Sequence, residues 1–178
     1  MAGSYSTSYD TVTVVWDNGA YSGIPESAVT YPVNGDWMSS LPSITGTAAD
    51  MPAGNPGVVQ GVGLQLQHLN PPPAECSGGS PCYWTGGWSV APTILQQPTV
   101  NVQVFQSSWS LASTLPGPAN LVSGGTYYIT SASTDNVKPT GNVESFFTPA
   151  RASTFTVDLD APASSVTAPL NGQVLPAL

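Results

Sequence analysis

Carboxylates beside asparagines are the residues of this chain best suited to chemistry. Ten acidic side chains stand against two permanent cations, and carboxylate and amide oxygens are ligands that Ca²⁺ prefers. The candidates for a calcium site are Asp50, Asp135, Glu144, Asp158 and Asp160. Their spacing matches no complete Ca²⁺ loop, and Asp and Asn also cap turns by bonding their own backbone. We expect turn capping, with Ca²⁺ as the alternative and no other cofactor.

Catalytic chemistry finds little support in the sequence. A glycosidase needs two carboxyl groups facing a sugar at a defined separation, and no general-acid context accompanies the acids here. A serine hydrolase needs a positioned base, but His68 is the only histidine and no G-x-S-x-G motif occurs. We interpret His68 as a partly exposed strand histidine and expect that the protein is not an enzyme.

Aromatic residues gather in the run Tyr83-Trp84-Thr85-Gly86-Gly87-Trp88, which is typical of two short strands around a Gly-Gly turn. Rings such as Tyr83, Trp84 and Trp88 can stack on sugars. They can also pack inside a sandwich, where aromatic side chains carry much of the buried area. We expect packing, with a glycan platform or a subunit interface as alternatives. Trp109 is expected in the core.

Two cysteines, Cys76 and Cys82, flank five residues rich in Gly, Ser and Pro. A metal-binding pair would normally be C-x₂₋₄-C with further Cys or His partners. This spacing instead suits a disulfide across a tight loop. A disulfide implies an oxidising, extracytoplasmic compartment, so we expect an extracellular or cell-surface protein.

Charged residues make up only 7% of the chain, and the net charge is −8. Binding to nucleic acid needs several cations, and an anionic membrane surface would repel this chain. No apolar run approaches the ~20 residues of a membrane span. Met1–Ser4 lack the cationic start and apolar stretch of a secretory signal, so we expect a mature or excised fragment, or added first residues.

Strand patterns dominate the sequence. Val58–Leu69 alternates, with Val62, Leu64 and Leu66 on one face, and Thr134–Glu144 reads as a loop. No stretch keeps a period of 3.6 residues, so helix should be minimal. Many short strands between Gly and Pro turns predict an all-β antiparallel sandwich. Further strands are expected at Thr11–Trp16, Ser27–Tyr31, Ser43–Ala48, Val100–Phe105, Ser107–Leu111, Thr126–Ala132 and Arg151–Asp158.

The end of the chain repeats its beginning. Ser27–Gly35 reads S-A-V-T-Y-P-V-N-G and Ser164–Gly172 reads S-S-V-T-A-P-L-N-G, with six of nine positions identical at an offset of 137 residues. Upstream, Thr11–Val14 (T-V-T-V) is echoed by Thr154–Val157 (T-F-T-V). Self-similarity of this kind indicates a repeat array. We therefore expect a sandwich at 24–160, preceded at 1–23 by the last strand of a preceding unit or a donor strand, and followed at 161–178 by the first strand of a next unit or a C-terminal extension.

Four motifs follow one another in order: I-T-G-T-A-A-D (Ile44–Asp50), Y-W-T-G-G-W (Tyr83–Trp88), T-D-N-V-K-P-T-G-N-V-E (Thr134–Glu144) and F-T-V-D-L-D-A-P (Phe155–Pro162). This order resembles the bacterial Ig-like tandem repeats of large secreted and cell-surface proteins, over residues 27–178. The Cys-bearing insertion and three extra residues between Asn136 and Gly141 depart from that pattern. The resemblance implies an Ig-like β-sandwich with extra terminal strands that belong to neighbouring units, in a structural or adhesive role.

We expect a structural subunit or repeat of an extracellular filament, stalk or surface adhesin, linked end to end through its terminal strands. Its partners would be copies of itself or neighbouring Ig-like repeats, head to tail, because strand addition and open head-to-tail contacts build linear assemblies. The alternative is a carbohydrate- or protein-binding β-sandwich module of a secreted protein, with a glycan on the aromatic residues. The assembly residues would be Thr11, Val12, Thr13, Val14, Val15, Trp16, Val166 and Leu170.

Overall fold

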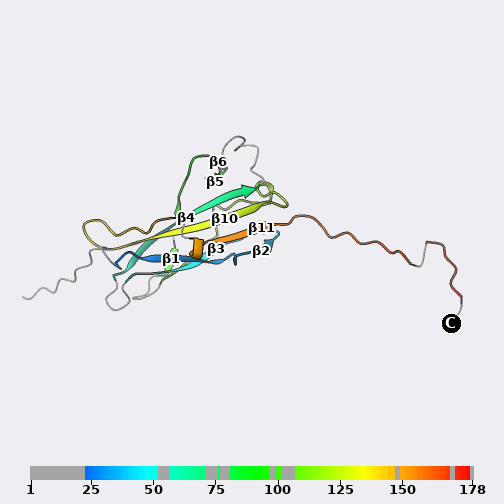
Figure 1. The fold of residues 1–178 in the computed structure, drawn as a ribbon, viewed down its shortest axis with the longest axis horizontal. Coiled ribbons are helices and arrows are strands. Elements are labelled where there is room, and N and C mark those ends of the chain that lie inside the picture. Colours follow the sequence, from blue (N-terminus) through cyan, green and yellow to red (C-terminus); the bar gives the residue numbers. More distant parts are fainter. Residues whose placement is uncertain are drawn as a thin grey trace, which may run out of the picture.

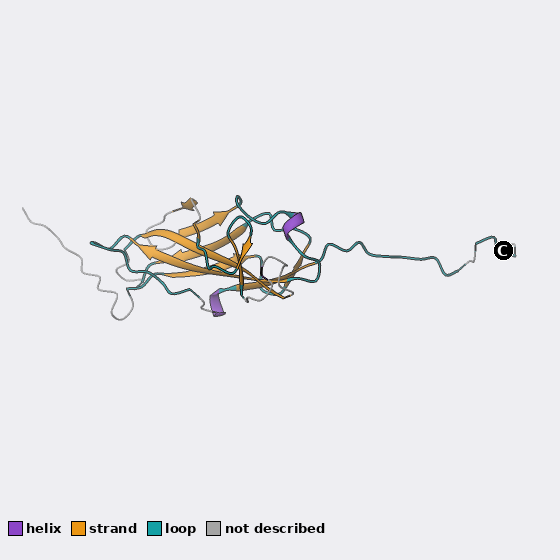
Figure 2. Ribbon diagram, turned by 90° about the horizontal axis from the view of Figure 1, so that it is seen from above, coloured by secondary structure: helices purple, strands orange, loops and turns teal. Residues whose placement is uncertain are grey.

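The described chain is an all-β sandwich of two facing sheets (Figures 1 and 2). A computed structural model describes residues 23–51, 57–70, 76, 81–96, 99–101, 107–146, 149–168 and 171–176. The expected strand Thr11–Trp16 lies outside these residues. Within them, helix is limited to two 3₁₀ turns, η2 (Pro118–Asn120) and η3 (Pro149–Arg151), and to 3₁₀ conformation at the single residue Cys76. The sequence-based prediction of a β-sandwich with minimal helix is therefore confirmed for the described residues.

The first sheet contains four antiparallel strands. Their order is β1 (Glu26–Tyr31), β3 (Ile44–Ala49), β9 (Ser107–Leu111) and β8 (Thr99–Asn101). Ile44 pairs with Leu111 and Gly46 pairs with Trp109 in the β3–β9 register.

The second sheet is built around two long strands, β10 (Thr126–Asp135) and β4 (Val59–Asn70), which pair along nearly their whole length. β7 (Leu95–Gln96) adds to β4 beside this path. β2 (Asp36–Met38) runs parallel to β11 (Ser153–Val157), so the expected antiparallel sandwich contains one parallel pair. The full order is β2 (Asp36–Met38), β11 (Ser153–Val157), β10, β4, β5 (Cys82–Trp84) and β6 (Trp88–Ser89).

Several strand bounds differ from those the sequence predicts. β10 continues to Asp135, into the stretch expected to be a loop. β8 covers only Thr99–Asn101 of the described residues, and the remainder of its expected range lies outside them. β2 and β7 were not expected, because strands of two or three residues are too short to show an alternating pattern.

The core lies between the sheets and follows the alternation of the strands. β3 and β11 both alternate buried and partly exposed residues, as a strand with one core face should. On β4, the predicted face of Val62, Leu64 and Leu66 is buried, and Trp109 is buried too. Gln65 and Gln67, on the opposite face of β4, are also buried, so the outer side of this strand is covered as well.

The Trp109 ring lies against Gly46 on the neighbouring strand β3. A Cβ atom placed on Gly46 would lie 2.0 Å from the Trp109 ring and 2.1 Å from the Ala28 carbonyl oxygen. The Trp109 indole Nε1 donates a 3.0 Å hydrogen bond to the Thr47 carbonyl. Because Gly46 has no side chain, the space beside it is open to the Trp109 ring, which is the largest side chain of the first sheet.

The described chain approaches and leaves the sandwich at opposite ends. Gly23, before β1, accepts a hydrogen bond from Asn142, which follows the C-terminal end of β10. Asp160, after β11, is bonded by Ser123, which precedes the N-terminal end of β10. We call these ends the N-terminal pole and the C-terminal pole. β10 has ten residues, so the poles are about 30 Å apart, and Figure 1 shows the C-terminal segment leaving the body beyond β11.

Candidate functional site

At the C-terminal pole, a turn is hydrogen-bonded to the end of β11. The Gly124 amide donates to the Val157 carbonyl at 2.7 Å, and the Val157 amide donates to the Gly125 carbonyl at 2.9 Å. The Ser123 hydroxyl then donates to the Asp160 carboxylate at 2.7 Å and accepts from the Leu159 amide at 3.0 Å. The segment that follows β11, which we call the connector, is thus hydrogen-bonded to the sandwich as far as Asp160.

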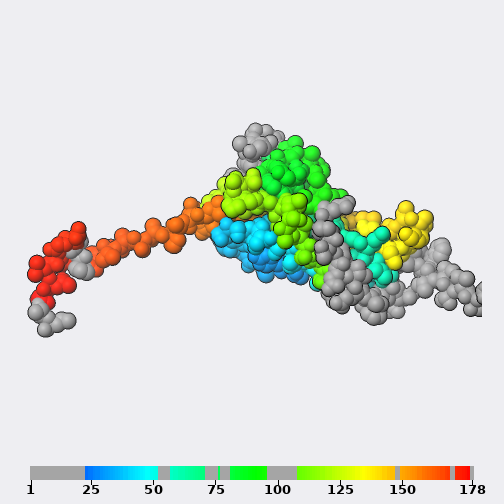
Figure 3. Space-filling view, turned by 180° about the vertical axis from the view of Figure 1, so that it is seen from behind, coloured from blue at the N-terminus to red at the C-terminus, as the bar shows by residue number. Residues whose placement is uncertain are grey.

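The residues that the structure describes beyond Asp160 are all exposed. Residues 161–168 and 171–176 contain no strand, and Figure 3 shows this segment standing away from the body. Pro162 disfavours helix at Ala161 and keeps the connector extended. Val166 is 82% exposed and Val174 is 92% exposed. Burial of apolar side chains away from water is favourable, and these two valines do not make that contribution within this unit.

The turn between β1 and β2 also contacts β11. The Asn34 side-chain oxygen accepts from the Thr154 amide at 2.9 Å, and the Gly35 amide donates to the Thr154 carbonyl at 2.6 Å. Gly35 has φ +90°, a conformation that favours glycine. The Asn-Gly pair therefore ties the β1–β2 turn to the last strand of the sandwich.

The N-terminal pole is organised around the Asp135 carboxylate, which is fully buried. Its Oδ1 accepts from the amides of Val137 and Asn142 at 3.0 and 2.7 Å, and its Oδ2 accepts from the Asn142 side chain at 2.8 Å. The same Asn142 amide group donates to the Gly23 carbonyl at 3.1 Å. The Asp135 carboxylate therefore stabilises the loop that is hydrogen-bonded to Gly23, as the turn-capping interpretation expects.

A second buried carboxylate, Glu144, joins the two sheets. Its Oε2 accepts from the amide and hydroxyl of Ser27 on β1 at 2.8 and 2.6 Å. It also accepts from the amide and hydroxyl of Ser133 on β10 at 3.0 and 2.9 Å. Ser27 further lies 2.8 Å from the hydroxyl of Ser131 on β10. We call Glu144 with these three serines the inter-sheet network.

Arg151 balances the charge of the inter-sheet network. It forms an ion pair with Glu144 Oε1 and a second one with Glu26 at 3.3 Å. Arg151 is one of the two cationic side chains in the sequence. A buried carboxylate is tolerated when it is paired and hydrogen-bonded, and Glu144 meets both conditions.

His68 lies inside the sandwich, so the prediction of a partly exposed histidine is wrong. It is 1% exposed and stacks on Tyr127 with ring centroids 4.3 Å apart. The Trp88 ring lies 5.3 Å away. Neither imidazole nitrogen has a hydrogen-bond partner, and burial lowers the pKa of His68 to about 4. The period-2 face of Leu64 and Leu66 continues to position 68, and this continuation was the available signal for burial.

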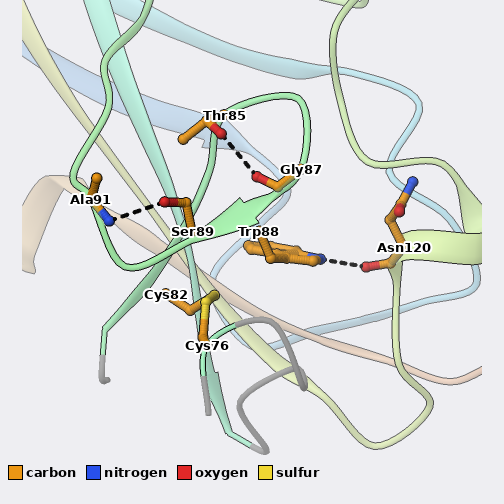
Figure 4. Close-up of a disulfide and its surroundings, with 8 residues drawn as sticks. All are labelled: Cys76, Cys82, Thr85, Gly87, Trp88, Ser89, Ala91 and Asn120. Atoms are coloured by element: carbon orange, nitrogen blue, oxygen red, sulfur yellow. Dashed lines mark hydrogen bonds between the residues drawn. A yellow bond between two sulfur atoms is a disulfide. The ribbon is translucent and has the colours of Figure 1, made fainter. Parts of the chain in front are cut away.

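The proposed glycan platform is mostly enclosed by the protein. Tyr83 is 8% exposed and Trp84 is 4% exposed, while Trp88 is half-buried and packs edge-on against Trp84. The Trp84 indole donates to the Thr114 carbonyl, and the Trp88 indole donates to the Asn120 carbonyl at 2.7 Å (Figure 4). These contacts favour packing for all three rings.

Cys76 and Cys82 form the expected disulfide, which Figure 4 shows below Trp88 and Ser89 of β6. Both cysteines are buried, and their Cα atoms are 5.9 Å apart. Cys82 begins β5 and pairs with His68 on β4. The disulfide therefore fastens Cys76 to the start of β5, which itself pairs with β4 beside the aromatic packing.

The five calcium candidates do not meet in one place. Asp135 and Glu144 accept the bonds described above, and the Asp158 Oδ1 accepts from the Asp160 amide at 3.0 Å. Asp50 is buried close to Gly57. Within the described ranges, no group of three or more His, Cys, Asp or Glu side chains lies close enough together to hold a metal ion.

Two surface features were missed by the sequence reasoning. Trp37, on the edge strand β2, is 71% exposed. A hollow of about 320 Å³ lies over Gly61 and Gly63 of β4, beside Ile94 and Phe146. The pairing of β2 with β11 was not visible in the sequence, so nothing marked Trp37 as an edge residue.

No model of a known protein family matches this sequence, and no curated protein matches it closely enough to count as a relative. None of the helical segments that the structure describes is long and apolar enough to cross a membrane.

Proposed function

We propose that this protein is an Ig-like structural unit of an extracellular filament, stalk or surface adhesin, joined end to end to similar units through its terminal segments. The observation that carries this proposal is the position of the two poles. The chain is held at Gly23 by one end of β10 and released after Asp160 at the other end. A unit whose two connections lie at opposite ends adds length to an array with every copy.

The strand order supports the Ig-like part of the proposal. One sheet of an immunoglobulin domain runs A-B-E-D, and the other runs through G, F and C, with C′ and C″ added in the variable type. Assigning β1, β3, β9 and β8 to A, B, E and D gives the first sheet, and β11, β10, β4, β5 and β6 then follow as G, F, C, C′ and C″.

A second feature of immunoglobulin domains is a tyrosine near the start of strand F whose hydroxyl bonds the backbone a few residues upstream. Tyr127, the second residue of β10, has this geometry, since its hydroxyl accepts from the Val122 amide at 2.9 Å. The disulfide departs from the antibody pattern, because Cys76–Cys82 closes a local loop and does not join two sheets.

The disulfide supports an extracellular setting, and the low content of charged residues, 7%, agrees with it. The binding-module alternative is less well supported, because the rings of Tyr83 and Trp84 are buried. The structural role needs no exposed ligand site, only two ends that can be joined.

Negative-stain electron microscopy with light scattering tests the proposal on the purified chain, alongside a variant that ends at Asp160. Strings of particles that disappear in the shortened variant would mean that separate subunits join through residues 161–178. Uniform single particles for both proteins would mean that the unit is joined covalently within a longer polypeptide.

Two outcomes would contradict the proposal. Side-by-side dimers or closed rings that persist in the variant ending at Asp160 would mean that the poles are not the joining surfaces. Retention on immobilised glycans that is lost on Trp88→Ala, with the fold intact, would favour the binding module.

A further inference from the structure

Residues 161–178 repeat β1 and the turn that follows it, including the buried positions of that segment. With the offset of 137 residues, the buried residues Pro25, Ser27 and Pro32 correspond to Pro162, Ser164 and Pro169, and all three pairs are identical. The differing positions within Ser27–Gly35 are Ala28, Tyr31 and Val33, which are partly or largely exposed. Every buried position of Ser27–Gly35 is therefore kept in the second copy, as expected if both segments fill the same place in a fold.

The hydrogen-bonding residues of the β1–β2 turn are repeated as well. Asn34 and Gly35, which bind Thr154, correspond to Asn171 and Gly172. Gly172 has φ +78°, close to the +90° of Gly35. After the turn, the β2 residues Trp37 and Met38 correspond to Val174 and Leu175, so the apolar character of this strand is kept.

The second copy has no sheet to occupy in this unit. Its described residues form no strand, and its apolar side chains at Val166 and Val174 face solvent. The equivalent place beside β3 is already filled by β1. The connector fastened at Asp160 carries the copy away from the C-terminal pole (Figure 3), where a following unit would lie.

We propose that residues 161–178 form β1 and β2 of a following copy of this fold, with Ser164 bound to a buried carboxylate as Ser27 is bound to Glu144. This inference rests on the proposed end-to-end function and names its partner, a second sandwich of the same type. The junction between two units is then only Asp158 to Pro162. Ser123 and Asp160 hold most of this junction against the first unit, so little chain is left free to bend.

The test is a longer polypeptide in which residues 42–178 follow Leu178 of the 178-residue chain. Residues 161–178 then stand in the place of 24–41 for the second unit. We expect amide hydrogens of residues 163–168 to exchange rapidly in the 178-residue chain and to become strongly protected in the longer polypeptide. Unchanged rapid exchange there would overturn the proposal.

Matched variants of the longer polypeptide make the test specific. Ser164→Asp puts a second negative charge beside the buried carboxylate of the second unit, so protection of residues 163–168 and of the second unit should be lost while the first unit stays protected. Ser165→Ala, at a position equivalent to the partly exposed Ala28, should retain protection. Equal protection in Ser164→Asp and Ser165→Ala would also overturn the proposal.

The same sample separates this inference from the proposed function. Protection of residues 163–168 reports whether the second unit uses this segment. The length of the particle reports whether the units lie end to end. Protection with two sandwiches folded side by side would contradict the proposed function alone.

Discussion

At the scale of single residues, the chemistry of this protein serves packing. Glu144 and Asp135 are buried carboxylates, and every hydrogen bond described for them comes from this chain's own serines, amides and Arg151. Glu144 bridges β1 and β10, which belong to opposite sheets. One oxygen atom, Glu144 Oε2, accepts hydrogen bonds from both sheets. The inter-sheet network therefore fixes the position of one sheet over the other and also stabilises their packing.

Removing Ser27 from the inter-sheet network should destabilise the fold. Ser27→Ala deletes a hydroxyl that donates to a buried carboxylate, and we expect a loss of about 2 kcal/mol in the free energy of unfolding, measured by urea denaturation. Thr30→Ala is the matched control, because Thr30 lies on the same strand, is exposed, and has its hydroxyl 3.2 Å from that of Thr45 and not against a buried carboxylate. It should change stability by less than about 0.5 kcal/mol. Equal effects of the two variants would contradict the role of the network.

His68 should make stability depend on pH in a defined window. Burial lowers the pKa of folded His68 from 6.5 to about 4, so between these values the unfolded chain binds a proton that the folded chain does not. The contribution of neutral, buried His68 to the free energy of unfolding is full above pH 6.5 and is lost as the pH falls towards 4. Since His68 is the only histidine, its proton NMR signals can be followed without assignment work.

The NMR titration of folded protein should show no protonation of His68 between pH 7 and 5. Urea unfolding of His68→Phe should show less loss of stability between pH 6.5 and 5 than the parent chain does. A midpoint near 6.5 in the folded protein would show that His68 is solvated, contrary to the packing against Tyr127 and Trp88.

At the scale of elements, three of the sequence motifs contain residues that contact one another or a neighbouring strand. The glycine of the Ile44–Asp50 motif makes room for Trp109, and the two tryptophans of the Tyr83–Trp88 motif pack on each other. In the Thr134–Glu144 motif, Asp135 bonds Asn142. The spacing within each motif is therefore set by strand register and loop closure.

Gly46 offers a sharp test of this view. A Cβ atom at position 46 would overlap the Trp109 ring and the Ala28 carbonyl, so Gly46→Ala must push β9 or β1 away from β3. We expect a loss of at least about 3 kcal/mol, or failure to fold, in thermal and urea unfolding. Gly61→Ala on β4 is the control, because a Cβ atom there meets nothing within 4 Å. Similar stability of the two variants would contradict the close packing of Trp109.

At the scale of the whole molecule, the sandwich and its core were predictable and the pairing of distant segments was not. Alternation in Val58–Leu69 marked Val62, Leu64 and Leu66 as core, because a strand has a period of two. The parallel pairing of β2 with β11 joins Asp36–Met38 to Phe155–Val157, and no local pattern reports such a partner. The burial of Glu144 was hidden for the same reason, since its donors lie 11 and 117 residues away.

The two poles give the molecule a direction. Gly23 is held at one end, and the chain beyond Asp160 is directed away from the other. A head-to-tail arrangement that does not close extends indefinitely. This directionality, together with the copy of β1 and β2 at residues 161–178, is the central claim about the molecule.

Small-angle X-ray scattering of the polypeptide that continues the chain with residues 42–178 tests this claim most directly. End-to-end joining at the poles predicts a rod whose largest dimension exceeds that of the 178-residue chain by about the length of one sandwich. A compact particle, with a largest dimension little greater than that of the single unit, would mean that the sandwiches lie side by side and would contradict the account.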